Sequence, residues 1–181
     1  MTIFLHGMCA TGRLECPVFS AATRSSWLLC PDGNAGCTGG GWMWAATVKQ
    51  AEARLLSATE ALKAKQEGRI QAGPMAIIGY SLGAPAALLQ AIQEPGRYDR
   101  LMIVNASVEP AAAMMKKAGV RRVALVAGAR DATANKLRSA AQRLVAAGVE
   151  ARYFALEATS HYFDAQSEAR MAEPLGWLLA P

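Results

Sequence analysis

The segment Gly79-Tyr80-Ser81-Leu82-Gly83 follows the pattern Gly-x-Ser-x-Gly. An apolar run at 75–79 leads into the serine, and an alanine-rich helical pattern at 82–93 follows it. A tight turn from strand to helix exposes its central side chain, and flanking glycines avoid clashes. We therefore predict that Ser81 is a nucleophile at a helix N-terminus, where free N–H groups stabilise negative charge. The alternative is a corner of small residues with a serine helix cap.

A serine hydroxyl needs a nearby base that is neutral at physiological pH, and histidine is the usual one. The chain has only two histidines, His6 and His161. His161 follows the last apolar run, at 151–155, which predicts a loop at the same sheet edge as Ser81. We therefore predict that His161 is the base.

A carboxylate is needed to orient the imidazole and to stabilise its protonated form. Asp131 follows the apolar run at 123–127 and precedes His161 in the chain, which makes it the favoured acid. Glu109, after the preceding apolar run, and Asp164, close to His161, are the alternatives. Asp131 also fits a simpler role as the N-cap of the helix predicted at 132–147.

An oxyanion hole for acyl transfer requires two backbone N–H donors aimed at one point. We predict that Leu82, directly after the nucleophile, supplies one donor and that Met8, after the first apolar run, supplies the other. Gly7 lets the backbone approach the substrate closely. His6 is then a structural residue of the loop rather than the base.

These residues lie between apolar runs that alternate with helical patterns. The predicted strands are 2–5, 27–30, 75–79, 101–105, 123–127 and 151–155, and the predicted helices are 44–66, 82–93, 132–147 and 164–179. Most strand runs are continuously apolar, which is typical of a parallel sheet buried on both faces. We expect an α/β fold, a doubly wound, mostly parallel sheet of about six strands with helices on both faces, in one domain covering 1–181.

The motifs together resemble those of the α/β-hydrolase superfamily, and within it the small serine carboxylesterases and acyl-protein-thioesterase-like enzymes. The similar segments are Leu5-His6-Gly7, 27–32, Trp42-Met43-Trp44, the serine pentapeptide, 128–131 and Ser160-His161. Their order of serine, aspartate and histidine is that of α/β-hydrolases. Family members usually carry two strands before the His-Gly strand, so the sheet is expected to have fewer strands than is usual in the family. No large lid is expected.

The resemblance implies hydrolysis of a carboxylic ester through an acyl-enzyme on Ser81, with His161 as base and Asp131 as orienting acid. It implies no metal and no organic cofactor. We expect Gly7, Trp42, Met43 and Tyr80 to contact a small-molecule ester or thioester substrate. The alternatives are an acyl thioesterase with the same triad, a serine peptidase, and a catalytically silent binding protein on the same fold.

Composition excludes several other classes. The 19 basic residues exceed the 14 acidic ones but are spread along the chain, so no nucleic-acid partner is predicted. Residues 71–93 carry no charge and are long enough to span a bilayer, but repeated Gly and Pro favour a strand, a turn and a helix.

The N-terminal residues do not look like a secretory signal, so we expect a cytoplasmic location. The four cysteines are Cys9, Cys16, Cys30 and Cys37. Their spacings match no zinc signature. In a cytoplasmic protein the default expectation for them is reduced, buried thiols, with disulfides as the alternative.

Overall fold

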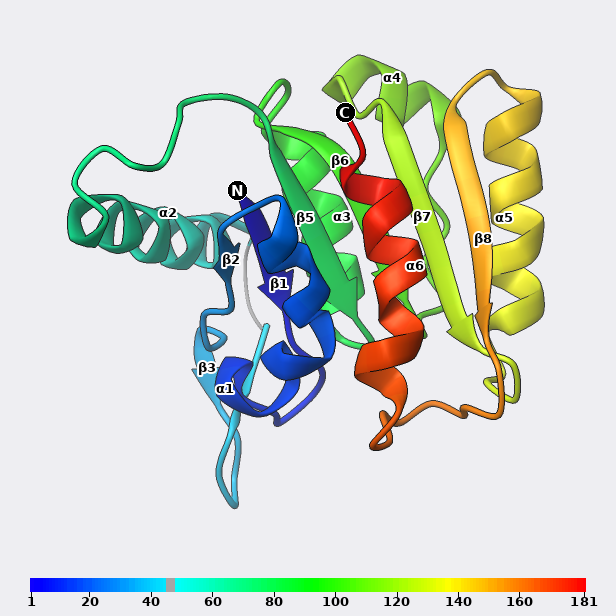
Figure 1. Cartoon of the computed structure of the whole chain (residues 1–181), viewed down its shortest axis with the longest axis horizontal. Helices are drawn as coiled ribbons and strands as arrows, with labels where there is room; N and C mark the ends of the chain where they lie inside the picture. The colour runs from blue at the N-terminus through cyan, green and yellow to red at the C-terminus, as the bar shows by residue number, and fades with distance from the viewer. Residues whose placement is uncertain (45–47) are drawn as a thin grey trace.

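Six strands form one sheet, and every pairing between them within the described residues is parallel (Figure 1). The computed structural model describes residues 1–44 and 48–181. Across the sheet, the strands are β2 (Leu28–Leu29), β1 (Thr2–Leu5), β5 (Met75–Tyr80), β6 (Tyr98–Val104), β7 (Arg122–Gly128) and β8 (Glu150–Leu156). The predicted α/β class and the predicted sheet of about six strands are confirmed.

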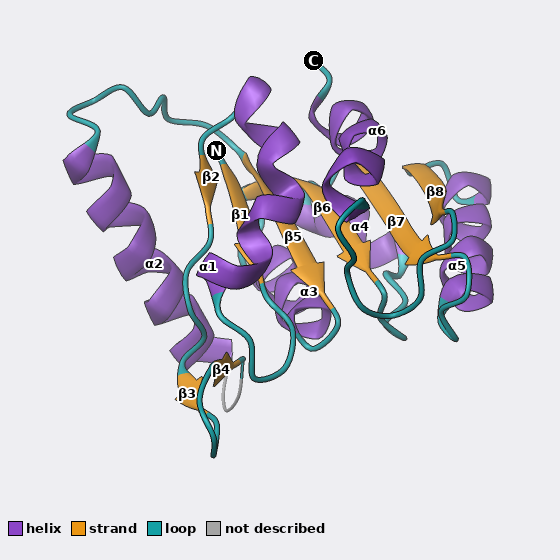
Figure 2. Ribbon diagram, turned by 60° about the horizontal axis from the view of Figure 1, so that its bottom comes forward, coloured by secondary structure: helices purple, strands orange, loops and turns teal. Residues whose placement is uncertain are grey.

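Helices cover both faces of this sheet (Figure 2). One face carries α2 (Val48–Lys65), α3 (Gly83–Gln93), α4 (Ala112–Ala118) and α5 (Ala134–Ala146). The short helix α1 (Gly12–Glu15) leads into the 3₁₀ helix η1 (Cys16–Arg24), which covers the other face together with α6 (Ser167–Leu179). The connection from β6 to β7 holds only α4, in agreement with the absence of a large lid.

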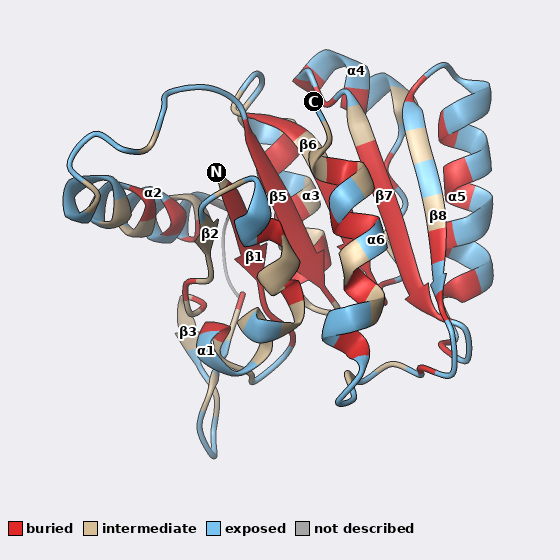
Figure 3. Ribbon diagram, in the orientation of Figure 1, coloured by how far each residue is buried: buried red, intermediate tan, exposed pale blue. Residues whose placement is uncertain are grey.

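The sheet has a hydrophobic core on each face. Successive residues of a central strand belong to different cores, because successive strand side chains point to opposite faces of the sheet. In β1, Ile3 and Leu5 join the core under α2 and α3, whereas Phe4 stacks on Phe19 of η1 with ring centroids 4.2 Å apart. The central strands are therefore buried along their length, whereas the edge strand β8 alternates (Figure 3). This burial explains the continuous apolar runs in the sequence.

Several elements differ from the sequence expectation. Helices α1, η1 and α4 were not predicted; η1 has the three-residue turn of a 3₁₀ helix and so lacks the 3.6-residue pattern. Within the long loop, β3 (Ala35–Gly36) and β4 (Trp42–Met43) form an antiparallel pair. The helix predicted at 44–66 corresponds to α2, with Trp44 outside it, and its positions 45–47 lie outside the described residues.

The uncharged segment 71–93 divides into β5, a turn and α3, as the glycines and prolines predicted. In the described part of the chain, none of the helices has both the length and the apolar character needed to cross a bilayer.

The expectation of reduced thiols is wrong for this structure, because the four cysteines form two disulfides. Cys9 pairs with Cys37, with Cα atoms 5.6 Å apart, and Cys16 pairs with Cys30, with Cα atoms 5.9 Å apart. The parallel pairing of β1 with β2 and the packing of the long loop on the β1 loop bring these residues together. The linear spacing of the cysteines did not show this proximity.

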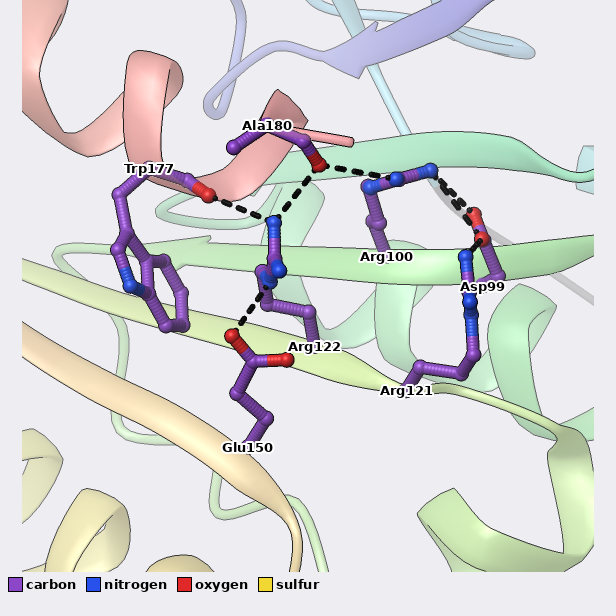
Figure 4. A network of polar contacts seen from close by, with 7 residues as sticks. All are labelled: Asp99, Arg100, Arg121, Arg122, Glu150, Trp177 and Ala180. Carbon is purple, nitrogen blue, oxygen red and sulfur yellow. Dashed lines mark hydrogen bonds and ion pairs between the residues drawn. The ribbon is translucent and has the colours of Figure 1, made fainter.

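Arginines at the amino ends of β6 and β7 attach the end of α6 to the sheet (Figure 4). Arg122 donates to the carbonyl oxygens of Trp177 (3.0 Å) and Ala180 (2.8 Å), and its guanidinium lies over the Trp177 ring. Arg100 donates to the same Ala180 oxygen at 3.1 Å. Cations are favourable here because the last carbonyls of a helix lack intrahelical partners.

Candidate active site

The candidate site lies beside β1, where the order in which the chain adds strands to the sheet reverses. From β1 the chain continues to β2 on one side, whereas β5 lies on the other side of β1 and leads on to β6. Clefts at the carboxyl ends of such strands are the usual ligand sites of doubly wound sheets. The residues that follow β1 and β5 therefore meet at this edge, with Leu5 paired to Gly79.

Ser81 occupies the turn between β5 and α3 in a strained backbone conformation. Its φ is +50°, and its N–H donates to the Val104 carbonyl at 2.9 Å. A Cβ on Gly79 would lie 2.4 Å from the Ala84 Cα, and one on Gly83 would lie 2.2 Å from the Leu5 carbonyl oxygen. Both glycines are therefore required for the close packing of this turn, as the pentapeptide predicted.

Three predicted residues meet in one hydrogen-bonded chain. His161 Nε2 lies 2.9 Å from Ser81 Oγ, and His161 Nδ1 lies 2.7 Å from Asp131 Oδ2. Because an ionised carboxylate can only accept, Nδ1 carries the proton and Nε2 accepts from the serine hydroxyl. The Asp131 side chain is 2% exposed and that of His161 is 38% exposed, so the acid is enclosed and the base is accessible to solvent.

Asp131 is held ionised by the turn that follows β7. Burial raises its pKa, but hydrogen bonds from the Thr133 hydroxyl and N–H, together with His161, outweigh burial and lower the pKa. The Thr133 N–H donates to Asp131 Oδ1 at 2.7 Å, which leaves Oδ2 for His161. Asp131 is not the residue directly preceding α5, which begins at Ala134.

The two alternative acids have partners away from Ser81. Glu109 forms an ion pair with Arg143 of α5, and both side chains are exposed. Asp164 forms an ion pair with Arg170 at 2.8 Å at the start of α6. Of the three candidates, the structure brings only Asp131 to His161.

Two residues, Asn105 and Tyr80, hold the loop that carries His161. This role was not predicted from the sequence for either of them. Asn105 is buried at the end of β6, donates to the His161 carbonyl at 2.7 Å and accepts from the Gly128 N–H at 2.8 Å. The Tyr80 hydroxyl donates to the same His161 carbonyl at 2.9 Å. Tyr80, predicted to contact substrate, is only 3% exposed and packs against Phe163.

The loop after β1 is fixed by the second histidine. The Gly33 N–H donates to His6 Nε2 at 2.9 Å, so Nδ1 carries the proton and donates to the Gly7 carbonyl at 2.8 Å. Burial lowers the pKa of His6, which keeps the ring neutral. In a trans peptide the N–H points opposite to the C=O, so the Met8 N–H points away from His6.

Neither predicted oxyanion donor is engaged elsewhere within the described residues. No acceptor among these residues binds the Met8 N–H or the Leu82 N–H, and Leu82 directly precedes α3. Met8 is also exposed. Within residues 1–44 and 48–181, these two N–H groups therefore have no backbone acceptor.

Trp42 and Met43 lie in β4, in the segment attached to the loop after β1. The Trp42 N–H donates to the Ala10 carbonyl at 2.8 Å, and the Cys9–Cys37 disulfide joins the same two segments. Trp42 is 41% exposed, whereas Met43 is half-buried. Among the described residues, no group of three or more His, Cys, Asp or Glu side chains is placed to hold a metal ion.

The profile of the esterase family, described as "Putative esterase", matches residues 51–152, more than half of the chain. The chain belongs to this esterase family. The matched segment includes Ser81 and Asp131, while His161 and the loop after β1 lie outside it. No curated protein shows significant sequence similarity to this chain.

Solved structures share the fold of this chain at low sequence identity. An uncharacterized protein from Bacillus cereus has a TM-score of 0.74 at 15% identity; the match covers 98% of this chain and 58% of that protein. The chain thus spans less than two thirds of the Bacillus protein. A carboxylesterase from Mesorhizobium loti has a TM-score of 0.65 at 15% identity, covering 99% and 88%. SOBER1 from Arabidopsis thaliana has a TM-score of 0.62 at 17% identity, covering 98% of each chain.

Proposed function

We propose that the protein is a serine hydrolase that cleaves carboxylic esters through an acyl-enzyme on Ser81. The observation that carries the proposal is the Ser81–His161–Asp131 chain, with heteroatom distances of 2.9 and 2.7 Å. Membership of an esterase family and the likeness of the fold to a carboxylesterase support it. A binding protein would have no need for a strained serine hydrogen-bonded to an oriented histidine.

In the first step, Ser81 Oγ attacks the acyl carbonyl carbon while His161 Nε2 accepts the hydroxyl proton. The carbonyl π electrons move to oxygen, and the Met8 and Leu82 N–H groups stabilise the oxyanion. Asp131 stabilises the imidazolium without taking its proton. When the tetrahedral intermediate collapses, the C–O bond to the alcohol breaks and the alcohol leaves with the proton from His161.

In the second step, His161 removes a proton from water, and the hydroxide attacks the acyl carbon bound to Ser81. Collapse breaks the bond to Oγ, which regains a proton from His161, and the carboxylic acid leaves. We place Trp42, Met43 and Gly7 at the mouth of the site as substrate contacts. Tyr80 acts instead through the His161 loop, because its hydroxyl is bound to the His161 carbonyl.

The experiment that tests this proposal is labelling with a fluorophosphonate, followed by mass mapping of the modified residue. We expect the label on Ser81, and we expect Ser81→Ala to lose both the label and turnover of p-nitrophenyl esters while its melting temperature is retained. A Ser81→Ala protein that still turns over esters would assign the chemistry to another residue. Parallel assays with acyl thioesters distinguish an esterase from a thioesterase with the same triad.

The two disulfides count against the cytoplasmic location that was expected from the sequence. Structural disulfides persist mainly in oxidising compartments, because cytosolic reductants keep thiols reduced. We therefore propose that the active protein works in an oxidising compartment. A count of titratable thiols in protein isolated from its native cell tests this: zero thiols support the proposal, and four contradict it.

A further inference from the structure

A second carboxylate lies at the candidate active site, and the mechanism above does not use it. Glu15, the last residue of α1, accepts a hydrogen bond from the Gly7 N–H at 2.9 Å through Oε2. Its other carboxylate oxygen, Oε1, faces Gly7 as well, 3.5 Å from where a Cβ would sit. Glu15 therefore binds the peptide that directly precedes the Gly7–Met8 peptide.

Glu15 and His6 together fix the two torsions of Gly7. The Gly7 N–H is bound to Glu15, and the Gly7 carbonyl accepts from His6 Nδ1 at 2.8 Å. Glycine has unusual conformational freedom, so without these two bonds the Gly7–Met8 peptide could rotate. The direction of the Met8 N–H consequently depends on Glu15 as well as on His6.

The backbone around Glu15 is itself held in place. The side chain of Thr11 caps α1 by accepting from the Leu14 N–H, and the Gly12 N–H donates to Asp32 Oδ1 at 2.8 Å. The next residue, Cys16, is linked to Cys30. This anchoring is what a residue needs if it is to position another group.

The charge of Glu15 also acts on the base. Glu15 and His161 attract each other electrostatically, and Asp131 accepts a hydrogen bond from His161 Nδ1. Tyr80 and Tyr162 also face His161. Burial raises the pKa of Tyr80, which keeps that phenol uncharged.

The ionised form of Glu15 has a cost for the stability of the fold. Burial raises the pKa of its carboxyl, and the Gly7 hydrogen bond and His161 offset only part of that effect. With a raised folded-state pKa, the folded protein binds more protons than the unfolded chain just above the ordinary glutamate value. Stability is therefore lost as the pH rises through this window, and the ionised Glu15 destabilises the fold at neutral pH.

We propose that Glu15 is a positioning residue of the esterase reaction, which aligns the Met8 oxyanion donor through its hydrogen bond to Gly7. The inference rests on the proposed function. The acidic side chain of α1 then serves to stabilise the transition state rather than the folded structure.

The test compares Glu15→Gln, which keeps a carbonyl oxygen for Gly7 but removes the charge, with Glu15→Ala, which removes both. For Glu15→Ala we expect kcat on the alkaline plateau to fall by about 10-fold or more with little change in KM, since loss of a whole oxyanion donor costs about 10²–10³. For Glu15→Gln we expect a plateau kcat within about threefold of wild type, because the acceptor remains.

Glu15→Ala and Glu15→Gln separate the hydrogen bond from the charge. Both variants lose the carboxylate charge, but only Glu15→Ala loses the acceptor for the Gly7 N–H, so only Glu15→Ala should be slow. The matched control is Glu60→Gln on the exposed surface of α2, which makes the same charge change beside Lys63 and should leave kcat and KM unchanged. We also expect Glu15→Gln to keep or raise the melting temperature at pH 7.

A Glu15→Ala protein with wild-type kcat, or a Glu15→Gln protein as slow as Glu15→Ala, would overturn the proposal. If Glu15→Ala does not fold, Glu15→Asp takes its place: its side chain is one methylene shorter, so its carboxylate no longer reaches the Gly7 N–H and the same fall in kcat is expected. These outcomes differ from failure of the proposed function, which would show as turnover or labelling that survives Ser81→Ala.

Discussion

At the scale of single residues, the candidate site depends on a few side chains held by backbone atoms from distant parts of the chain. The sequence predicted Ser81, Asp131 and His161, because each follows a recognisable apolar run and their order is restricted. It did not predict Asn105 or Glu15, since their partners are backbone groups of residues 7, 128 and 161 that only the fold brings near. An asparagine at a strand end has no spacing signal of its own.

One feature of Asn105 suggests a function even without its partners. Its φ is +47°, in the left-handed region that asparagine tolerates better than most residues. Together with Ser81, also at positive φ, it places strained backbone at the ends of two adjacent strands. Strain of this kind persists where surrounding contacts impose it, and it is concentrated at functional sites.

The first prediction concerns the acid. Asp131→Asn should reduce kcat by on the order of 10⁴, because the neutral amide no longer holds the His161 tautomer that accepts the serine proton. Steady-state kinetics with p-nitrophenyl acetate provide the measurement. Glu109→Gln is the control, since Glu109 pairs with an exposed arginine, and its kcat should stay near wild type. The opposite ranking would place the acid on the loop after β6.

The same variant should change the acid stability of the fold. Asp131 has a lowered pKa in the folded state, so its ionised form stabilises the fold above the ordinary aspartate value of about 4. That contribution is lost as the pH falls through the lower folded-state value, because the folded carboxylate must then take up a proton. The free energy of unfolding of Asp131→Asn, measured with denaturant between pH 3 and 7, should lack this pH-dependent contribution.

At the scale of elements, the strand–turn–helix unit of β5, Ser81 and α3 was predictable because its signal is local. The arrangement of α6 was not, since its end is fixed by arginines on β6 and β7 that lie far away in sequence. The helices η1 and α4 escaped prediction for a different reason. The former is a 3₁₀ helix and the latter has seven residues, too few to show helical periodicity.

The arginine contacts lead to a stability prediction. Arg122→Ala should lower the free energy of unfolding by about 1–3 kcal/mol, because the Trp177 and Ala180 carbonyl oxygens lose a half-buried donor and the Trp177 ring loses its contact with the guanidinium. Arg143→Ala, which breaks an exposed ion pair with Glu109, should change it by no more than about 1 kcal/mol. If urea titrations show equal losses of unfolding free energy for both variants, the contacts of Arg122 with the end of α6 stabilise the fold no more than an exposed ion pair does.

At the scale of the whole molecule, the parallel sheet was predictable because two-sided burial requires continuous apolar strands. The edge strand β2 was predicted too long, since only Leu28 and Leu29 find a pairing partner in β1. The cysteine pairs were missed because cysteine spacing alone does not determine connectivity. The predicted single-domain organisation stays a prediction.

Reduction of the disulfides should destabilise the protein without removing any triad residue. Loops of 14 and 28 residues are closed, and each crosslink is expected to contribute about 3 kcal/mol by restricting the unfolded chain. Thermal unfolding with and without a thiol reductant should show a clear drop in melting temperature. The Cys16→Ala, Cys30→Ala double variant keeps the Cys9–Cys37 crosslink and should lose only part of that difference. Four reactive thiols in the untreated, folded protein would contradict the pairing.

The position of β1 in the sheet has a consequence for how the chain matures during translation. All four cysteines have been synthesised by residue 37, whereas the β5 partner of β1 begins only at Met75. An oxidant that meets the nascent chain therefore acts on unstructured thiols, and four cysteines can pair in three ways. We expect oxidation after the polypeptide has folded to give a higher yield of Cys9–Cys37 and Cys16–Cys30 than oxidation of the emerging chain, because the finished sheet brings the correct sulfurs together.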